Sequence, residues 1–177
     1  MAELSIGHFR QFGTAIGKFL LIAIILPLIP VLILGLPAGG TLALMASTFV
    51  IEYGAGPVGI GLGLPPVFVL WVVVCVALGI TLLFFDILDA LAGHSARVST
   101  FLARAEERAK RSNLISRHGI YGLIPGVMIL GIYVCSPVSW ILGGNRKYSV
   151  VLIFAGYTLA ATGTILVTLG ILKLFFT

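Results

Sequence analysis

The stretch IEYGAGPVGIGLGLPP, residues 51–66, decides how this chain folds. It contains Glu52, the only charged side chain between Lys18 and Asp86, and glycines follow it at every second or third position. Glycine permits turns and close approach of two backbones, but small residues also pack membrane helices together. The composition and the predicted spans of the whole chain are needed to interpret a single carboxylate beside such a run.

The composition is that of an integral membrane protein. Of 177 residues, 59% are hydrophobic and 10% are charged, and the mean hydropathy is +1.17. A soluble domain carries roughly 25% charged residues, so this chain cannot form a solvated surface. We therefore expect one all-α membrane domain over residues 1–177, built as a small helical bundle.

Charge and cysteine content narrow the expected partners. The net charge is +5, and the basic residues adjoin apolar segments, so anionic lipid headgroups are the expected partner and nucleic acid is not. Cys75 and Cys135 lie in apolar surroundings, without a Cys-x-x-Cys pair or a Cys/His cluster. We expect buried thiols, no disulfide, no metal and no cofactor.

Three segments are predicted to span the membrane. They run from Phe19 to about Leu36, from about Pro66 to Phe85, and from about Ser149 to Leu172, and each has roughly the 20 residues that a spanning helix needs. Residues 1–18 form an N-terminal amphipathic segment. The first half of the domain is 19–85, the linker is 86–118, and the second half is 119–177.

Two further apolar segments, 37–65 and 119–145, are rich in glycine and proline. Each has the length of one broken span or of a re-entrant hairpin. The linker 86–118 holds six of the eleven Lys and Arg residues, which places it and the N-terminus in the cytoplasm. This charge rule favours a hairpin for 37–65, whereas for 119–145 it discriminates weakly and both alternatives stay open.

An internal repeat supports paired hairpins. YGAGPVGIGLG (53–63) aligns with YGLIPGVMILG (121–131) at an offset of 68 without a gap, and five of eleven positions are identical. Inverted repeats in transporters bring broken helices together near the middle of the membrane. Irregular backbone is tolerated at that depth where protein buries it or where it lines a wet cavity.

Glu52 is the leading functional candidate. A charged carboxylate at the centre of a membrane helix costs roughly 2.5 kcal/mol or more, and taking up a proton lowers that cost. We therefore predict a proton carrier or a counter-charge for a cationic substrate. The alternative is a hydrated residue at the outer interface.

The other candidates carry hydroxyl groups or break helices. Tyrosine hydroxyls in the repeat suit a freed carbonyl, a headgroup or Glu52, although tyrosine is also common at membrane interfaces. Ser136 precedes Pro137, which indicates the turn or second arm of a hairpin, or an ordinary kinked helix. The predicted substrate or proton site comprises Glu52, Tyr53, Pro57, Tyr121, Pro125 and Ser136.

The linker predicts a surface helix. Residues 95–113 place apolar side chains on one face, which suits the inner leaflet; a solvated linker helix is the alternative. Arg117, His118 and Arg146 are the predicted headgroup contacts. Asp86 and Asp89 end a predicted span and are expected to face water. Because no acid–base pair, activated nucleophile or metal cluster appears, we do not expect an enzyme.

Two motifs carry a family resemblance. EYGAGP with GIGLGLPP (52–66) and RHGIYGL (117–123) resemble the DedA superfamily, most closely its branch of small multidrug export proteins. The likeness covers about residues 40–172. Tyr53 stands where that branch has an arginine, and LGIYVCSP replaces its PGTG-like turn.

This resemblance implies two inverted re-entrant hairpins flanked by membrane helices in a prokaryotic cell membrane. It also implies movement of lipids or lipid phosphates between leaflets, or proton-driven export. We expect a transporter of an amphipathic substrate, coupled to protons through Glu52. A proton-coupled exporter of small cations and a non-transporting membrane scaffold are the alternatives. Three spans are few for a transporter, so we expect a homodimer.

Overall fold

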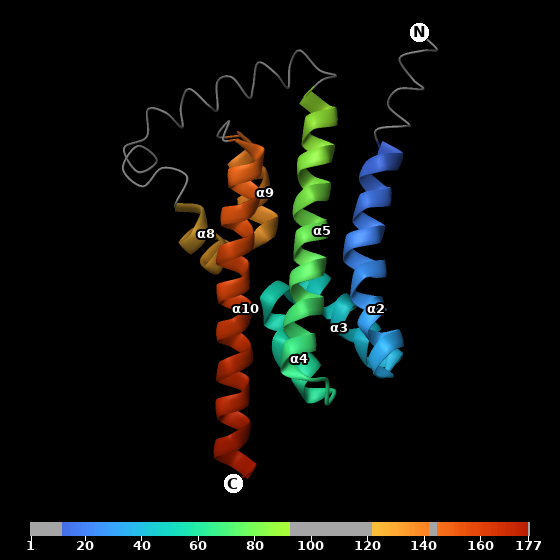
Figure 1. Ribbon diagram of the computed structural model, residues 1–177. Helices are drawn as coiled ribbons and strands as arrows, with labels where there is room; N and C mark the ends of the chain where they lie inside the picture. The colour runs from blue at the N-terminus through green and yellow to red at the C-terminus, as the bar shows by residue number, and fades with distance from the viewer. Residues whose placement is uncertain (1–11, 93–121, 142–144, 177) are drawn as a thin grey trace.

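The computed structural model describes residues 12–92, 122–141 and 145–176, with the side chains of 91–92 and 172–176 excepted, and its elements are all helices (Figure 1). The predicted surface helix, 95–113, lies outside the described residues. The predicted headgroup contacts Arg117 and His118 and the predicted site residue Tyr121 lie outside them too. The predicted all-α membrane class is confirmed.

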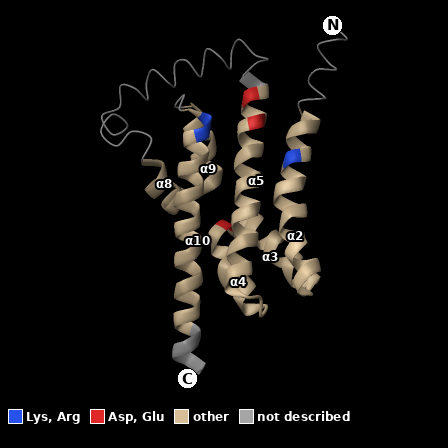
Figure 2. Ribbon diagram, viewed as in Figure 1, with Lys and Arg blue, Asp and Glu red and all other residues tan. Residues whose placement is uncertain are grey.

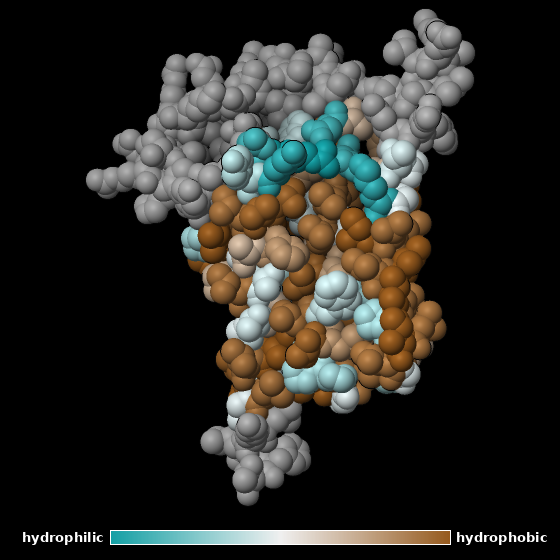
Figure 3. Space-filling model, viewed as in Figure 1, coloured by the Kyte–Doolittle hydropathy of each residue, from teal (hydrophilic) through white to brown (hydrophobic). Residues whose placement is uncertain are grey.

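Four helices have the length and composition to cross a membrane, one more than the sequence predicted. They are Phe12–Leu34, Ala38–Gly61, Pro66–Ala90 and Arg146–Ile171. In the view of Figure 3, polar side chains form a band near the upper end, and the surface below it is mainly hydrophobic. This distribution suits a bundle whose long sides face lipid.

The first span changes helix type along its length. It contains a π-helical segment, η1 (Leu21–Ile25), followed by α2 (Leu26–Leu34). Pro27 and Pro30 lie in α2, and each lacks the N–H that would bond four residues back. The π-helical turn directly before the two prolines therefore accommodates the loss of these hydrogen bonds. Gly35, with φ of 62°, ends the helix.

Helix α5 (Pro66–Ala92) is the centre of the core. It starts at a proline, which the first helical position tolerates, and it buries Val69, Val72, Val73 and Val76. Helix α10 (Arg146–Phe176) packs against it. Because α5 continues through Ala92, Asp86 lies within the helix rather than at its end, contrary to the prediction.

One of the four apolar helices, Ala38–Gly61, is a bent segment. It consists of α3 (Ala38–Ile51), the 3₁₀ turn η2 (Glu52–Ala55) and α4 (Gly56–Gly61). A Cβ atom on Gly40 would lie 3.9 Å from the Cβ of Leu62, so the start and the end of the segment are neighbours. The chain therefore turns back at η2, and we call α3, η2 and α4 the first hairpin.

A second hairpin follows the linker. Helices α8 (Leu123–Leu130) and α9 (Ile132–Ile141) are separated by Gly131, with φ of 79°. A Cβ atom on Gly126 would lie 3.5 Å from Sγ of Cys135, so α8 and α9 pack against each other. In Figure 1 the first hairpin occupies the lower half of the bundle and the second hairpin the upper half.

The two hairpins are not equivalent at the predicted offset of 68. That alignment pairs Gly63 with Gly131, and both have positive φ. However, Gly63 follows α4 at the outer end of the first hairpin, whereas Gly131 is the turn of the second. The turn of the first hairpin begins at Glu52. The sequence repeat therefore matches residues that hold different places in the structure.

Candidate functional site

Glu52 joins the turns of the two hairpins. Its Oε2 atom accepts a hydrogen bond from the backbone N–H of Ile132 at 2.9 Å, and Oε1 accepts one from Tyr133 at 3.5 Å. These are the first two residues of α9, whose N–H groups have no partner within the helix. The partial positive charge of a helix N-terminus also favours a carboxylate there. The lone carboxylate of residues 51–66 thus caps a helix of the opposite hairpin.

The backbone at both turns suits this contact. Glu52 has φ of 52°, which is a strained conformation for a residue with a Cβ atom. At Gly131, a Cβ atom would lie 2.6 Å from the carboxyl carbon of Glu52. Glycine is therefore required at position 131 by its positive φ and by the approach of the carboxylate.

Two tyrosines bond across the turns in opposite directions. Tyr53 donates its hydroxyl hydrogen to the carbonyl oxygen of Met128 at 2.9 Å, near the end of α8. Tyr133 donates to the carbonyl oxygen of Phe49 at 2.6 Å, near the end of α3. Carbonyl groups in the last turn of a helix need such outside donors. Each hairpin therefore completes the hydrogen bonding of the other, and of the partners predicted for Tyr53, the freed carbonyl is the one found.

Helix α10 supports the contact from the side. Thr164 donates to the carbonyl oxygen of Tyr53 at 3.0 Å. The ring of Tyr157 meets the ring of Tyr53 edge-on, with centroids 5.9 Å apart. Tyr157 is only 1% exposed. The turns are therefore enclosed by protein on this side.

A groove runs past this contact on the surface of the bundle. It has a volume of about 660 Å³ and is mainly apolar, with hydroxyl groups on Tyr53, Thr164 and Thr168. Tyr53 and Met128 both line it, so the hydrogen bond between the hairpins lies in its wall. The residues that line the groove are Tyr53, Pro57, Met128, Leu159, Ala160, Gly163, Thr164, Val167, Thr168 and Ile171.

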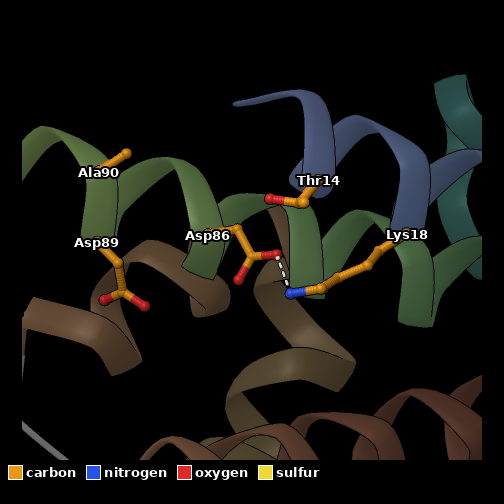
Figure 4. A pocket seen from close by; sticks show the side chains of 5 residues that line it. All are labelled: Thr14, Lys18, Asp86, Asp89 and Ala90. Atoms are coloured by element: carbon orange, nitrogen blue, oxygen red, sulfur yellow. Dashed lines mark hydrogen bonds and ion pairs between the residues drawn. The ribbon is translucent and has the colours of Figure 1, made fainter. Parts of the chain in front are cut away.

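A second polar cluster lies at the upper end of the bundle. Asp86 of α5 pairs with Arg146 of α10 and, at 3.2 Å, with Lys18 of the first span. Figure 4 shows Lys18 and Asp86 in contact with each other among the residues that line a pocket of about 210 Å³. Asp89 accepts hydrogen bonds from Arg146 at 2.8 Å and from Trp140 of α9 at 2.6 Å. The cluster ties together four segments of the chain.

This cluster overturns one sequence prediction and gives Arg146 partners that the sequence did not indicate. The side chain of Asp86 is 13% exposed, so it does not face water as expected, because two cations cover it. Arg146, predicted to contact headgroups, has its guanidinium held by Asp86 and Asp89. Figure 2 shows the charges gathered at this end, with one acidic position near the middle of the bundle.

The predicted site residues divide into two groups. Glu52, Tyr53 and Pro57 come together at the hairpin contact and the groove. Pro125 is exposed on α8 and does not line the groove. Ser136 is fully buried on the second arm of its hairpin, α9. Of the alternatives for Ser136, the second arm is therefore found and the turn is not, whereas its role in a substrate or proton site stays a prediction.

Sequence reasoning missed the partners of Glu52 and Tyr53. Gly131 and Tyr133 lie in the sequence LGIY, residues 130–133, where a glycine interrupts an apolar segment next to a tyrosine. The sequence EYG, residues 52–54, likewise has a tyrosine beside a glycine within an apolar segment. That parallel was the available signal for a second turn. Met128 and Thr164 contribute through a backbone carbonyl and a hydroxyl, which no motif indicates.

The described residues offer no metal centre. Within them, no group of three or more His, Cys, Asp or Glu side chains is placed to hold an ion. Cys75 and Cys135 are buried free thiols, in agreement with the buried positions predicted for them. The chemistry of the site is therefore that of carboxylate, hydroxyl and backbone groups.

Comparison with known proteins identifies the family. The profile of the family described as "Putative small multi-drug export protein" matches residues 52–162. This range starts at Glu52, includes the turn at Gly131 and covers more than half of the chain. Neither the curated proteins nor the solved structures gave a significant match. With its four apolar helices, the chain is an integral membrane protein that belongs to this small multi-drug export family.

Proposed function

We propose that the protein moves an amphipathic substrate, a lipid or lipid phosphate, between the leaflets of the membrane. The observation that carries this proposal is the groove of about 660 Å³ between the two hairpin turns and α10. Its mainly apolar wall suits acyl chains. Its few hydroxyl groups donate to backbone carbonyls and leave their oxygens as acceptors for a polar head. Leu159, Val167 and Ile171 in its wall are more than half exposed, so it opens toward lipid.

In this proposal both hairpins are re-entrant and inverted relative to each other. Supporting it, Gly40 and Leu62 lie at the same end of the first hairpin. The polar groups of the two turns satisfy one another, which removes the cost of irregular backbone inside the membrane. The end that carries Lys18, Arg146 and Lys147 is the cytoplasmic one by the charge rule. The same arrangement is what the DedA resemblance implies.

The contact between the turns acts as a gate. The groove follows α10 from Leu159 to Ile171, roughly 18 Å at 1.5 Å per residue. This is the part of α10 farther from Arg146, so the groove serves one half of the membrane. For the substrate to reach the other half, the bonds between the turns must break.

Glu52 gives the gate a proton dependence. Ionised carboxylates accept shorter and stronger hydrogen bonds than neutral groups do. A proton on Glu52 would weaken its bonds to Ile132 and Tyr133 and so favour separation of the turns. Proton coupling through Glu52 would then act on the gate rather than on the substrate.

The family description favours a second candidate, export of small cationic molecules. Here Glu52 would be the counter-charge. Against this role, both carboxylate oxygens already accept backbone N–H groups, so a cation would share Glu52 with the start of α9. Lipid movement therefore remains the leading proposal.

Leaflet exchange in liposomes tests the proposal. Reconstituted protein would be assayed with labelled lipid and a quencher of the outer leaflet. Gly163→Trp fills the groove, since nothing lies within 4 Å of the added Cβ position. Leu166→Trp is the control, because Leu166 is exposed on α10 outside the groove.

We expect fast exchange for the wild type and Leu166→Trp, and slow exchange for Gly163→Trp. Exchange at the rate of empty liposomes would reject lipid movement. Uptake of ethidium in the same vesicles would then identify the cation exporter, and absence of both activities would favour a scaffold, for which Glu52→Gln would be silent.

A further inference from the structure

Four buried hydroxyl groups lack hydrogen-bond partners within the described part of the chain. They belong to Ser136, Ser139, Ser149 and Tyr157, and each of these residues is at most 1% exposed. Leaving a buried polar group unpaired is unfavourable, and nearly all such groups in proteins find a partner. In the interior of a protein the usual partner for an unpaired hydroxyl is a bound water molecule.

Helical spacing puts the hydroxyls of each helix on its buried face. Ser149 and Tyr157 lie eight residues apart on α10, on the face that also holds the buried Ile153. Ser136 and Ser139 lie on the buried face of α9. Helices α5, α9 and α10 contact one another. The hydroxyls therefore share the interior between these three helices.

Helix α9 contacts a carboxylate near each of its ends, Glu52 at its start and Asp89 near its last residues. Ile132 begins α9, and its N–H bonds to Glu52. Trp140, next to Ser139, donates to Asp89 at the upper polar cluster. The row of hydroxyls therefore lies on helices whose two ends contact Glu52 and the ion pairs of Asp86 and Asp89.

A small cavity lies at the Glu52 end of the row. It is lined in part by Ile132, Tyr157 and Thr81, and its volume is about 10 Å³, which suits about one water molecule. Thr81 donates its hydroxyl hydrogen to Ala77 and keeps an oxygen lone pair as an acceptor. Tyr157 supplies an unpaired hydroxyl, so a water here would have polar partners.

We propose that these hydroxyls hold a file of water molecules between α5, α9 and α10, and that the file conducts protons between the Asp86–Asp89 cluster and Glu52. Each water or hydroxyl accepts a proton on one side and releases one on the other, so one proton moves and no other reactant is consumed. The effect of a proton on Glu52 rests on the proposed gate. The existence of the water file does not depend on the proposed function.

The groups around each end are consistent with this path. Tyr133 and Cys135 of α9 and Tyr157 of α10 interact electrostatically with Glu52. Helices α3, α4 and α8 carry no titratable residues in their described ranges, and α5 carries Cys75, Asp86 and Asp89. In the described part of the chain, cations lie near Asp86 and Asp89, but none pairs with Glu52.

Hydroxyl-radical labelling by X-ray pulses detects bound water directly. The intact protein in lipid nanodiscs would be irradiated in ¹⁸O-water and its oxidised residues located by mass spectrometry. Cys75 is the matched control, since it is as buried as Cys135 and one helical turn from Gly79, which packs against Ala23 of the first span.

We expect ¹⁸O incorporation at Tyr157 and Cys135 and little at Cys75. Equal labelling of the two cysteines, with Tyr157 unlabelled, would overturn the water file. Because this readout needs no transport activity, the file can stand even if leaflet exchange fails.

Proton flux tests the conduction step. Protein in vesicles that contain a pH-sensitive dye would be exposed to a pH jump, for wild type, Tyr157→Phe and Tyr148→Phe. Tyr148 is 66% exposed and serves as the matched control. We expect proton entry about tenfold slower for Tyr157→Phe, which corresponds to a barrier about 1.4 kcal/mol higher, and unchanged entry for Tyr148→Phe. Wild-type entry in a folded Tyr157→Phe variant would overturn conduction along this row.

Discussion

At the scale of single residues, Glu52 is an acceptor that holds one hairpin to the other. Hydrogen bonds to charged groups contribute about 1.5–3 kcal/mol, so Glu52→Ala should lower the free energy of unfolding by about that amount. Glu52→Gln keeps one acceptor oxygen and should lose less. Denaturant titration in detergent, followed by circular dichroism, measures both. Wild-type stability of Glu52→Ala would show that the bonds to Ile132 and Tyr133 contribute nothing.

Gly131 is the matching residue on the other hairpin. Gly131→Ala should destabilise the protein by about 1–3 kcal/mol, from strain at a positive φ and displacement of the carboxylate. Gly170→Ala is the control, since nothing lies near its Cβ position and alanine favours a helix. Combined with Glu52→Ala, the loss should be less than additive. Additive losses would mean that the two positions do not interact.

Part of this residue-level picture was predictable. A carboxylate isolated in apolar sequence is costly, and that cost alone identified Glu52. Its role as a helix cap was not predictable, because the partners are the backbone N–H groups of Ile132 and Tyr133, eighty residues away in sequence. Composition carries no information about which distant amides a side chain will meet.

At the scale of elements, the central feature is that residues 38–61 turn back on themselves. A double variant Gly40→Cys and Leu62→Cys should form a disulfide spontaneously, since the Cβ separation of 3.9 Å falls in the usual range of about 3.5–4.5 Å. The pair would be placed in a Cys75→Ala, Cys135→Ala background and detected by mass spectrometry.

Gly40→Cys with Val50→Cys is the control, because Val50 is highly exposed near the other end of α3. A straight crossing helix would place residues 40 and 62 at opposite faces of the membrane. Failure of the Gly40–Leu62 pair to close would therefore contradict the hairpin.

The breaks in the chain were easier to predict than their pairing. Glycine and proline between residues 51 and 66 indicated an interrupted segment, and the structure interrupts it at Glu52. The sequence repeat nevertheless misaligned the two turns, because glycines recur throughout apolar sequence. Turn positions depend on which backbone groups are satisfied by the opposite hairpin, and a sequence alignment does not contain that information.

At the scale of the whole molecule, two polar contacts organise an apolar bundle. The cluster of Lys18, Asp86, Asp89 and Arg146 joins the first span, α5 and α10 at one end. The Glu52 contact joins the hairpins in the middle. The charge rule predicted the placement of the basic residues at one end, but the acidic partners that hold Lys18 and Arg146 were expected to face water. This expectation holds for Asp89, whose side chain is 48% exposed, and is wrong for Asp86, which is 13% exposed beneath Lys18 and Arg146.

The central claim is that transport requires the two turns to separate. Tyr53→Cys and Met128→Cys, in the Cys75→Ala, Cys135→Ala background, place thiols on either side of the contact that Tyr53 and Met128 now make. A short bis-methanethiosulfonate reagent would bridge them, and a reductant would release them. Tyr53→Cys alone, treated with the same reagent, is the control for labelling.

The decisive measurement is therefore lipid exchange between leaflets before bridging, after bridging and after reduction. We expect that exchange stops while the bridge is in place, returns when the bridge is reduced, and continues in the treated single variant. Undiminished exchange in the fully bridged protein would contradict this expectation, since the turns could not then be the gate.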